Sequence, residues 1–324
     1  MPYRDLDHAI ALVNRGQGSL VASVITHDRD VARQVVYEAG PFHGRLYFNN
    51  RDSMGESTGH GAPLPHMVHG GPGADHSIAK PYFSQLTDIA QVIYYDHRGN
   101  GRSDLGKKED WNLSQWGDDI KGLCDSLGIV KPIVIGTSFG GFATLSYATR
   151  HPNHAAGLAL ISTAAKVDFS TIYQAFERRG GKEVRNIAEA YWTRPTDDGR
   201  ELYKKRCVPF YSYESVGSPD WLPRVLWRND TALWFNGPNN EHGQFDYRND
   251  LSKIECPALV MVGEEDPITP PEFSDSIVEN LRSDRVRYVK FKNCGHGVVG
   301  DKPKEALKAL RDFIEAVVVE RNGT

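Results

Sequence analysis

The sequence predicts an α/β protein in which a mostly parallel central sheet is covered by helices on both faces. Short apolar runs typical of strands alternate with stretches of helical periodicity, which is the pattern of strands joined by crossover helices. This alternation stops after Ala165 and returns at "PALVMVG", Pro257–Gly263. The chain has 324 residues, of which 40% are apolar and 25% charged, so it is long enough to bury a sizeable core.

The first part of the chain carries the weaker signals. Leu6 to Val13 has the spacing of a short helix, and "SLVASVIT" that of a strand. "RQVVYEA" and "GRLYFNN" indicate two strands joined by a Gly-Pro turn. "PLPHMVHG" and "DIAQVIYYDHRG" indicate two more strands, each ending in a glycine-rich turn.

Later elements are clearer. "NLSQWGDDIKGLCDSLGI" predicts a helix capped by Asn112 or Ser114, and it precedes the strand "PIVIG". A helix over "FATLSYATRHP" and a strand over "AAGLALIST" follow. The last four elements are the strand "PALVMVG", the helix "PEFSDSIVENLRS", the strand "RVRYVKF" and the helix "KPKEALKALRDFIEAVVV".

These elements predict three parts of the chain. Residues 1–33 form an N-terminal extension, residues 34–165 and 251–324 form the core, and residues 166–250 form a helical cap inserted after the sixth core strand. The cap segment holds 15 aromatic residues, including four of the six tryptophans. Such residues either pack the cap onto the core or line an apolar pocket.

A possible nucleophile lies in "GTSFGG", between a predicted strand and a predicted helix. This is the G-x-S-x-G pattern, in which a serine on a sharp turn needs small neighbours. Gly136 and Gly140 leave that space around Ser138. The alternative is a serine that only caps a helix beside a glycine that only packs.

A serine hydroxyl needs a base, and in this architecture the acid and then the histidine follow it along the chain. Asp266 and His296 each come directly after a predicted strand, at the carboxyl edge of the sheet. His296 is expected to accept the Ser138 proton, and Asp266 to orient the imidazole. Glu264 and Glu265 are rival carboxylates, but the register favours Asp266.

Acyl transfer also needs N–H donors for the developing oxyanion. We expect one from Phe139, which follows the serine, and the other from Gly71, with Gly70 as the alternative. No Lys-Ser/Thr follows the glycines of "HGGPG", so this loop is not a P-loop. Each of His66, His69 and His97 is expected to brace a loop rather than to bind a metal.

Together, "HGGPG", "DHRGNGRSD", "GTSFGG", "GEEDPITP" and "CGH" resemble the proline iminopeptidase branch of the α/β-hydrolase superfamily over roughly Gly44 to Val317. The resemblance implies an α/β-hydrolase fold with a helical cap and, for the type enzymes, release of an N-terminal proline. It also implies that acidic residues hold the substrate amine.

One such acid in the family is the cap glutamate after Asn-Gly-Pro, here Glu241, displaced one place by Asn240. Another directly follows the catalytic aspartate, where this chain has Pro267. Glu241 and Asn240 are therefore candidate substrate-binding residues, together with the aromatic pair Trp234 and Phe235 that precedes the Asn-Gly-Pro motif.

We expect a serine hydrolase that cleaves an amide or peptide bond at an N-terminal proline or small apolar residue. The alternative is an esterase or lactonase acting on neutral apolar substrates, which the loss of the second acid favours. A third hypothesis is a non-catalytic ligand receptor that retains the triad.

Composition restricts the partners. The net charge of −4 and the pI of about 6.3 give no electrostatic case for nucleic acid. No apolar run approaches the roughly 20 residues of a membrane span, and no secretory signal is recognised. The scattered cysteines predict free thiols. We expect a cytoplasmic enzyme without metal or organic cofactor that acts on a small molecule or short peptide; the oligomeric state stays open.

Overall fold

The computed structural model describes residues 5–14, 22–25, 31, 34–35, 46–49, 65–214 and 222–322. The chain divides into two compact units, Met1–Gly61 and Ala62–Thr324, and each is described by itself. The domain limits expected from the sequence, 1–33, 34–165 with 251–324, and 166–250, stay predictions.

The N-terminal unit contains the helix α1 (Leu6–Asn14) and two parallel strands, β1 (Ala22–Ile25) and β2 (Leu46–Asn49). They lie where the sequence predicts a helix and two strands. The strand expected over "RQVVYEA" is wrong in its described residues, because Gln34 and Val35 are helical. Val35 packs in a small cluster with Ile10 of α1, and this tertiary contact outweighs the β propensity of a valine.

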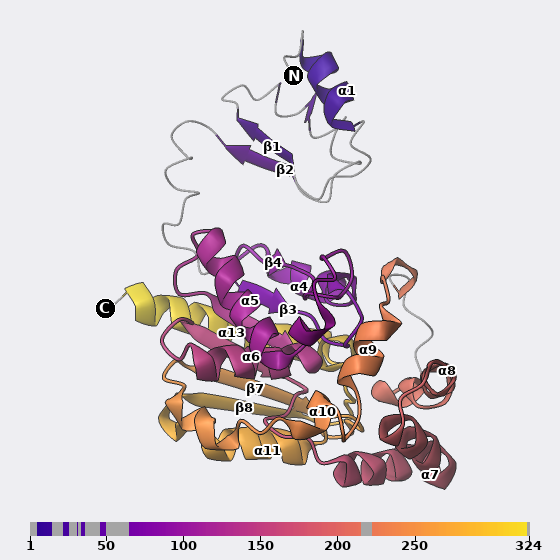
Figure 1. Ribbon diagram of the computed structural model, residues 1–324. Coiled ribbons are helices and arrows are strands. Elements are labelled where there is room, and N and C mark those ends of the chain that lie inside the picture. The colour runs from indigo at the N-terminus through magenta and orange to yellow at the C-terminus, as the bar shows by residue number, and fades with distance from the viewer. Residues whose placement is uncertain are drawn as a thin grey trace. The chain divides into compact units, whose positions relative to one another are not determined.

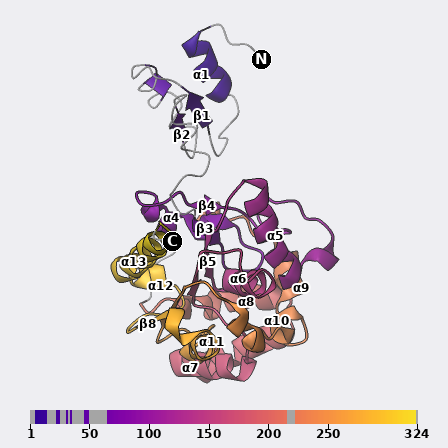
Figure 2. The same cartoon turned by 90° about the vertical axis from the view of Figure 1, so that its left-hand side faces the viewer.

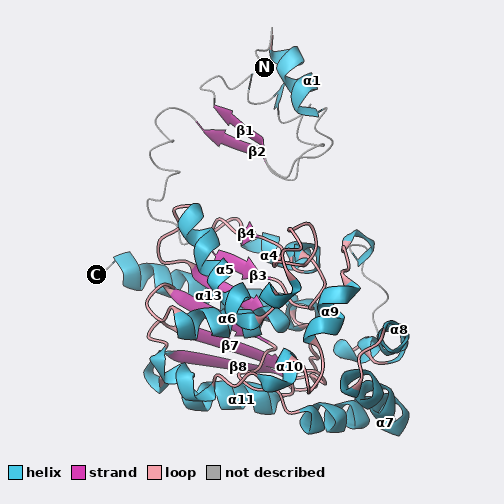
Figure 3. Ribbon diagram, in the orientation of Figure 1, coloured by secondary structure: helices cyan, strands magenta, loops and turns pink. Residues whose placement is uncertain are grey.

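The second unit is built on a six-stranded sheet with the order β4-β3-β5-β6-β7-β8. Every neighbouring pair is parallel, as the alternation of strands and helices predicts (Figure 3). The strands are β3 (Pro65–Val68), β4 (Ile93–Tyr94), β5 (Ile133–Thr137), β6 (Gly157–Ile161), β7 (Ala258–Gly263) and β8 (Val286–Phe291).

Helices cover both faces of this sheet (Figures 1 and 2). Alternate strand residues divide between two hydrophobic clusters: Val134 and Leu158 join one, and Ile135 and Ala159 join the other. The first cluster includes side chains of α5 (Leu113–Ser126), α6 (Phe139–Arg150) and α11 (Pro271–Asn280). The second includes side chains of α4 (Lys80–Phe83), α12 (Val298–Asp301) and α13 (Pro303–Asn322).

Local signals fix where helices begin. The Asn112 side chain accepts a hydrogen bond from the Gln115 N–H at 2.8 Å and so caps α5, which settles the choice between Asn112 and Ser114. Thr196 caps α8 (Asp197–Arg206) in the same way. Asp168 caps α7 (Phe169–Thr193), which changes direction at Gly181, where φ is 78°.

The segment between β6 and β7 is helical in its named elements, as expected for the cap. Beyond α7 and α8 these are the 3₁₀ turns η5 (Val208–Tyr211), η6 (Leu222–Arg224) and η7 (Arg248–Lys253), with α9 (Asn229–Phe235) and α10 (Glu241–Gln244). In Figure 3, α7, α8 and α9 group at one side of the unit. Asp266 and His296 follow the carboxyl ends of β7 and β8, and Ser138 that of β5, so all three side chains belong to the same edge of the sheet.

Candidate active site

Ser138 occupies a strained turn between β5 and α6. Its backbone has φ 52° and ψ −123°, a conformation that is costly for a residue with a side chain. The Ser138 N–H donates to the Ile161 carbonyl at 2.9 Å, and its carbonyl accepts from the Gly141 N–H at 2.8 Å. The surrounding structure therefore holds the serine in this conformation.

The two glycines of the motif are required by close contacts, as expected. A Cβ at Gly140 would collide with the carbonyl oxygens of Val68 and His69 at the end of β3. A Cβ at Gly136 would collide with the Thr144 hydroxyl of α6. Both positions must stay small for the helix to approach the sheet behind the serine.

Asp266 and His296 are in direct contact. The imidazole Nδ1 lies 2.8 Å from Asp266 Oδ2 and 3.0 Å from Oδ1. The aspartate side chain is fully buried and that of the histidine is 11% exposed. Because a carboxylate only accepts, Nδ1 carries the proton and Nε2 is the basic nitrogen.

The acid is fixed by its own loop. Asp266 Oδ1 accepts from the N–H groups of Ile268 and Thr269 at 2.8 and 2.9 Å. The Thr269 hydroxyl donates to Oδ2 at 2.8 Å. The rivals Glu264 and Glu265 are exposed, in agreement with the register argument. The role of Thr269 was not predicted, although "DPIT" offers the hydroxyl three residues after the acid.

Two consecutive residues after β6 connect the serine turn to the histidine loop. The Ser162 hydroxyl donates to the His296 carbonyl at 2.8 Å, and the Thr163 hydroxyl donates to the Ser138 carbonyl at 2.9 Å. The structure thus brings Ser138, Asp266 and His296 to neighbouring loops. Sequence reasoning missed this pair, whose only signal is two hydroxyls directly after a buried strand.

The expected oxyanion donors also border the serine turn. Phe139 is the first residue of α6, so its N–H has no acceptor within the helix. A Cβ at Gly70 would lie 3.1 Å from the Ser138 Cβ, which places this loop against the nucleophile. Gly71 follows with φ +69°, a value that favours glycine.

Two of the three histidines expected to brace loops contact this one, whereas His66 lies within β3 and its Nδ1 is 3.7 Å from Cys124 Sγ. His69 Nδ1 donates to the Gly70 carbonyl at 3.0 Å, and His69 Nε2 accepts from the His97 N–H at 3.2 Å. Burial lowers the pKa of His69 and holds that of His97 well below its usual range. Both rings are therefore neutral, and the two bonds of the His69 ring place its proton on Nδ1.

A second network of polar side chains, centred on the buried Asp75 and Asp96, follows this loop. Asp96 Oδ1 accepts from His76 Nδ1 at 2.7 Å, and Asp96 Oδ2 accepts from the Arg102 N–H at 2.8 Å. Arg102 also pairs with Asp75. Burial alone would raise the pKa of Asp96, but these hydrogen bonds hold it well below its usual value. This network was not predicted from the sequence.

The cap is anchored to both glycine-rich loops. The Arg228 N–H donates to the Gly73 carbonyl at 2.6 Å, and the Arg228 guanidinium donates to the Gly101 carbonyl at 3.0 Å. The Thr231 hydroxyl donates to the Gly99 carbonyl at 2.5 Å. The start of α9 is thereby fixed to the loop that borders Ser138 and to the glycine-rich turn after β4.

The aromatic candidates of the cap take different positions. Phe235 is buried, and its ring lies 5.0 Å from that of Phe139, the residue after the nucleophile. Trp234 is 46% exposed and packs edge-on against Trp111 at 6.5 Å. The structure thus brings Phe235, but not Trp234, to the serine turn.

The polar candidates lie at the start of α10. Glu241 Oε1 accepts from the Leu113 N–H, at the start of α5, at 2.8 Å. Burial raises the pKa of Glu241. The Asn240 side-chain amide donates to the Asn236 carbonyl at 2.5 Å and to the Leu233 carbonyl at 3.3 Å. Asn240 therefore closes the turn between α9 and α10.

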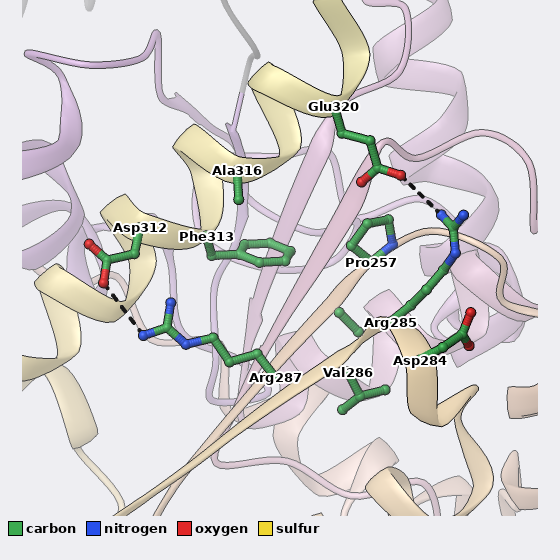
Figure 4. A pocket seen from close by; sticks show the side chains of 10 residues that line it. Pro257, Asp284, Arg285, Val286, Arg287, Asp312, Phe313, Ala316 and Glu320 are labelled. Carbon is green, nitrogen blue, oxygen red and sulfur yellow. Dashed lines mark hydrogen bonds and ion pairs between the residues drawn. The ribbon is translucent and has the colours of Figure 1, made fainter. Parts of the chain in front are cut away.

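Other features of the described residues add no second site. Within them, no group of three or more acidic, histidine or cysteine side chains is arranged to hold a metal ion, and the four cysteines are free. No helix described combines the length and apolar character that a bilayer crossing requires. A hollow of about 420 Å³ lies at the amino ends of β7 and β8, away from Ser138 (Figure 4). Its arginines, Arg285 and Arg287, are paired with Glu320 and Asp312.

Comparisons with known proteins agree with this geometry. Residues 67–303 match the model of the alpha/beta hydrolase fold family. A proline iminopeptidase of Pestalotiopsis fici is 30% identical over 78% of this chain and 92% of its own length. A proline iminopeptidase of Thermoplasma volcanium is 27% identical over 76% and 87%. An esterase structure from Thermogutta terrifontis is 25% identical over 79% and 91%, with a TM-score of 0.60.

The chain belongs to the α/β-hydrolase fold family, within its proline iminopeptidase-like branch. The fold expected from the sequence is thereby confirmed, and the protein is a hydrolase.

Proposed function

We propose that the protein is a serine hydrolase that acts through an acyl-enzyme at Ser138, with His296 as the base and Asp266 as its orienting acid. The observation that carries this proposal is the Asp266–His296 pair, with 2.8 Å between Oδ2 and Nδ1. The histidine loop is tied to the serine turn through Ser162 and Thr163. Nε2 is the nitrogen left to take a proton.

The proposed reaction has two halves. Ser138 Oγ attacks the substrate carbonyl carbon while its proton passes to His296 Nε2, and the oxyanion is stabilised by the N–H groups of Phe139 and of Gly71 or Gly70. The carbonyl re-forms, the bond to the leaving amine or alcohol breaks, and the histidine returns the proton to that group. His296 then takes a proton from a water molecule whose oxygen attacks the acyl carbon. The bond to Ser138 Oγ breaks, the acid leaves, and His296 returns the proton to Oγ.

The leading substrate class is a peptide or amide with a free N-terminal amine on proline or a small apolar residue. Among the described residues, the Glu241 carboxylate accepts one hydrogen bond, from the Leu113 N–H, and forms no ion pair. A half-buried carboxylate without a cation has a raised pKa. An ammonium group of the substrate would supply the missing positive charge.

Residues next to Glu241 and to its partner Leu113 pack around Phe139, the residue after the nucleophile. Leu113 opens α5, and one turn later Trp116 packs 5.0 Å from Phe139. On the other side, His242 stacks on Phe235 at 5.2 Å, and Phe235 contacts Phe139 in turn. Both relatives named as proline iminopeptidases support the same reading.

A second candidate is an esterase or lactonase acting on neutral apolar substrates. The specific observation is that, among the candidate acids in the described part of the chain, Glu241 would have to hold the amine without a second carboxylate. Pro267 replaces the second acid, and Glu264 and Glu265 are exposed. The buried Asp75 and Asp96 are already engaged by Arg102 and His76.

The test combines one variant with a pair of substrates. We expect Ser138→Ala to abolish hydrolysis with the fold intact by circular dichroism; normal turnover would remove the whole proposal. On the wild type, kcat/KM is compared for proline p-nitroanilide and its N-acetylated form. A large preference for the free amine supports the aminopeptidase. Equal rates, or turnover of an aryl ester alone, support the esterase.

A further inference from the structure

A segment of the cap runs directly over the loop that carries His296. The His296 N–H donates to the Tyr211 carbonyl, with 2.6 Å between N and O. The Tyr211 ring stands edge-on to the imidazole, with centroids 5.2 Å apart. The cap therefore contacts both the backbone and the ring of the histidine.

One carboxylate oxygen joins the two segments a second time. Asp301 Oδ2 accepts from the Gly295 N–H at 2.7 Å and from the Tyr213 N–H at 2.8 Å. Gly295 precedes the histidine, and Tyr213 belongs to the cap. Hydrogen bonds to a charged acceptor are stronger than neutral ones. Asp301 therefore holds the histidine loop and the cap segment together through a single oxygen.

Gly295 lets the two chains approach closely. A Cβ there would meet the carbonyl group of Tyr211, with its carbon only 3.0 Å away, and the carbonyl carbon of Ser212 at 3.1 Å. No positive φ is involved at this residue. The glycine before the histidine therefore serves the passage of the cap segment and not an unusual backbone conformation.

The cap segment is itself held by cap helices. Arg179 of α7 donates to the Ser212 carbonyl at 2.8 Å. The Tyr211 hydroxyl lies 2.8 Å from that of Tyr203 in α8. On the side of the core, the Ser162 hydroxyl holds the His296 carbonyl at 2.8 Å. The histidine backbone is thus fixed between the core and the cap.

We propose that Gly295, Asp301 and residues 211–213 form a clamp through which the cap sets the position of the catalytic base. The inference rests on the proposed function, because it assigns His296 that role. Asp301 is a positioning residue: it touches no reacting atom and acts through the histidine loop. The cap then contributes to proton transfer as well as to substrate binding.

The test is Asp301→Ala, with Asp312→Ala as the control. Asp312 is a helical aspartate that pairs with Lys308 and Arg287, outside the clamp. Since a misplacement of about 1 Å can cost roughly 100-fold, we expect kcat on p-nitrophenyl acetate to fall about 10- to 100-fold with KM nearly unchanged. Titration with a fluorophosphonate should reach the full number of sites, only more slowly.

Asp301→Asn should recover most of the rate, because the amide oxygen can accept both N–H groups. Gly295→Ala tests the clamp sterically and keeps every charge; it should lower kcat in the same way, and it replaces Asp301→Ala if that variant does not fold. The clamp is overturned if Asp301→Ala and Gly295→Ala keep the wild-type kcat, or if they lose activity in proportion to titratable sites. If the proposed function itself is wrong, the Ser138→Ala variant remains active, and this result is distinct from those that overturn the clamp.

Discussion

Two carboxylates, Asp266 in the core and Glu241 in the cap, differ in how many hydrogen bonds they accept. Asp266 accepts two backbone N–H groups, the Thr269 hydroxyl and the imidazole of His296. Glu241 accepts one N–H, from Leu113, and forms no ion pair within the described residues. The first acid has all its acceptor capacity in use, whereas the second retains an oxygen and an uncompensated charge.

This difference fits two roles: Asp266 positions another side chain, whereas Glu241 is available to a ligand. A saturated carboxylate has a single orientation, which is what an orienting acid needs. A half-buried carboxylate with spare capacity costs free energy until a donor or cation arrives.

The largest effect is expected for Asp266→Asn. The amide oxygen can still accept the loop N–H groups, but the amide nitrogen would face His296 Nδ1 and favour the wrong tautomer. We expect kcat to fall about 10⁴-fold, the size of effect typical of this substitution in a triad. The measurement is steady-state kinetics on p-nitrophenyl acetate.

Glu265→Gln is the matched control, since that carboxylate is adjacent in sequence but exposed. It should keep the wild-type rate. An Asp266→Asn enzyme with wild-type kcat would show that the pair does not serve catalysis.

The core part of the site was predictable because its constraints are local. The strand, the Gly-Thr-Ser-Phe-Gly turn and the helix each have a sequence signature, and the order of acid and base restricts Asp266 and His296 to two loops. Strand ends in a parallel sheet then bring these loops to one edge. Predicting this part of the site required no long-range contact other than the pairing of parallel strands.

The supporting contacts were not predictable, because each depends on which chains approach one another. Ser162 and Thr269 are ordinary hydroxyls in the sequence, and they act through distances of 2.8 Å to His296 and Asp266. Gly295 looks like any loop glycine until the Tyr211 carbonyl lies against it. Val35 is helical in the structure although its neighbours favour a strand, since a short apolar run does not distinguish the two.

The next largest effect is expected for Glu241→Gln. The amide oxygen keeps the acceptor for the Leu113 N–H, so the substitution removes the charge alone. Because a hydrogen bond to a charged group contributes about 1.5–3 kcal/mol, kcat/KM on proline p-nitroanilide should fall about 10- to 100-fold. The rate on the N-acetylated substrate should not change.

The pH dependence adds a check on the same residue. Burial raises the pKa of Glu241, so its negative charge is lost at a higher pH than in an exposed glutamate. The wild-type preference for the free amine should therefore decrease as the pH falls through this raised pKa, and Glu241→Gln should show no such change. An equal loss on both substrates would mean that Glu241 only supports α5, and the esterase reading would be favoured.

The smallest effect concerns His242, the residue after Glu241, and it tests whether the cap interior is apolar around that charge. The ring is buried among Phe235, Phe142 and Trp192, and Nδ1 has no hydrogen-bond partner among the described residues. Burial lowers the pKa of His242 to about 3 from 6.5. Below pH 6.5 the unfolded chain therefore binds a proton that the folded chain does not, and stability is lost as the pH falls from 6.5 towards 3.

A phenylalanine at position 242 keeps an aromatic side chain in the same place but has no nitrogen that could be protonated. We expect His242→Phe to be at least as stable as the wild type at pH 7, because an unpartnered polar atom is removed. Between pH 7 and 5.5 its free energy of unfolding should decrease by about 1 kcal/mol less than that of the wild type, measured by urea denaturation at both pH values. The remaining decrease comes from other buried histidines such as His97. An equal decrease in both proteins would mean that folding does not lower the pKa of His242, and the cap interior around Glu241 would then not be apolar. A smaller decrease in the wild type than in the variant would mean that folding raises this pKa, as an ion pair with Glu241 would, and the spare capacity that distinguishes the cap acid from Asp266 would then be filled from within the chain.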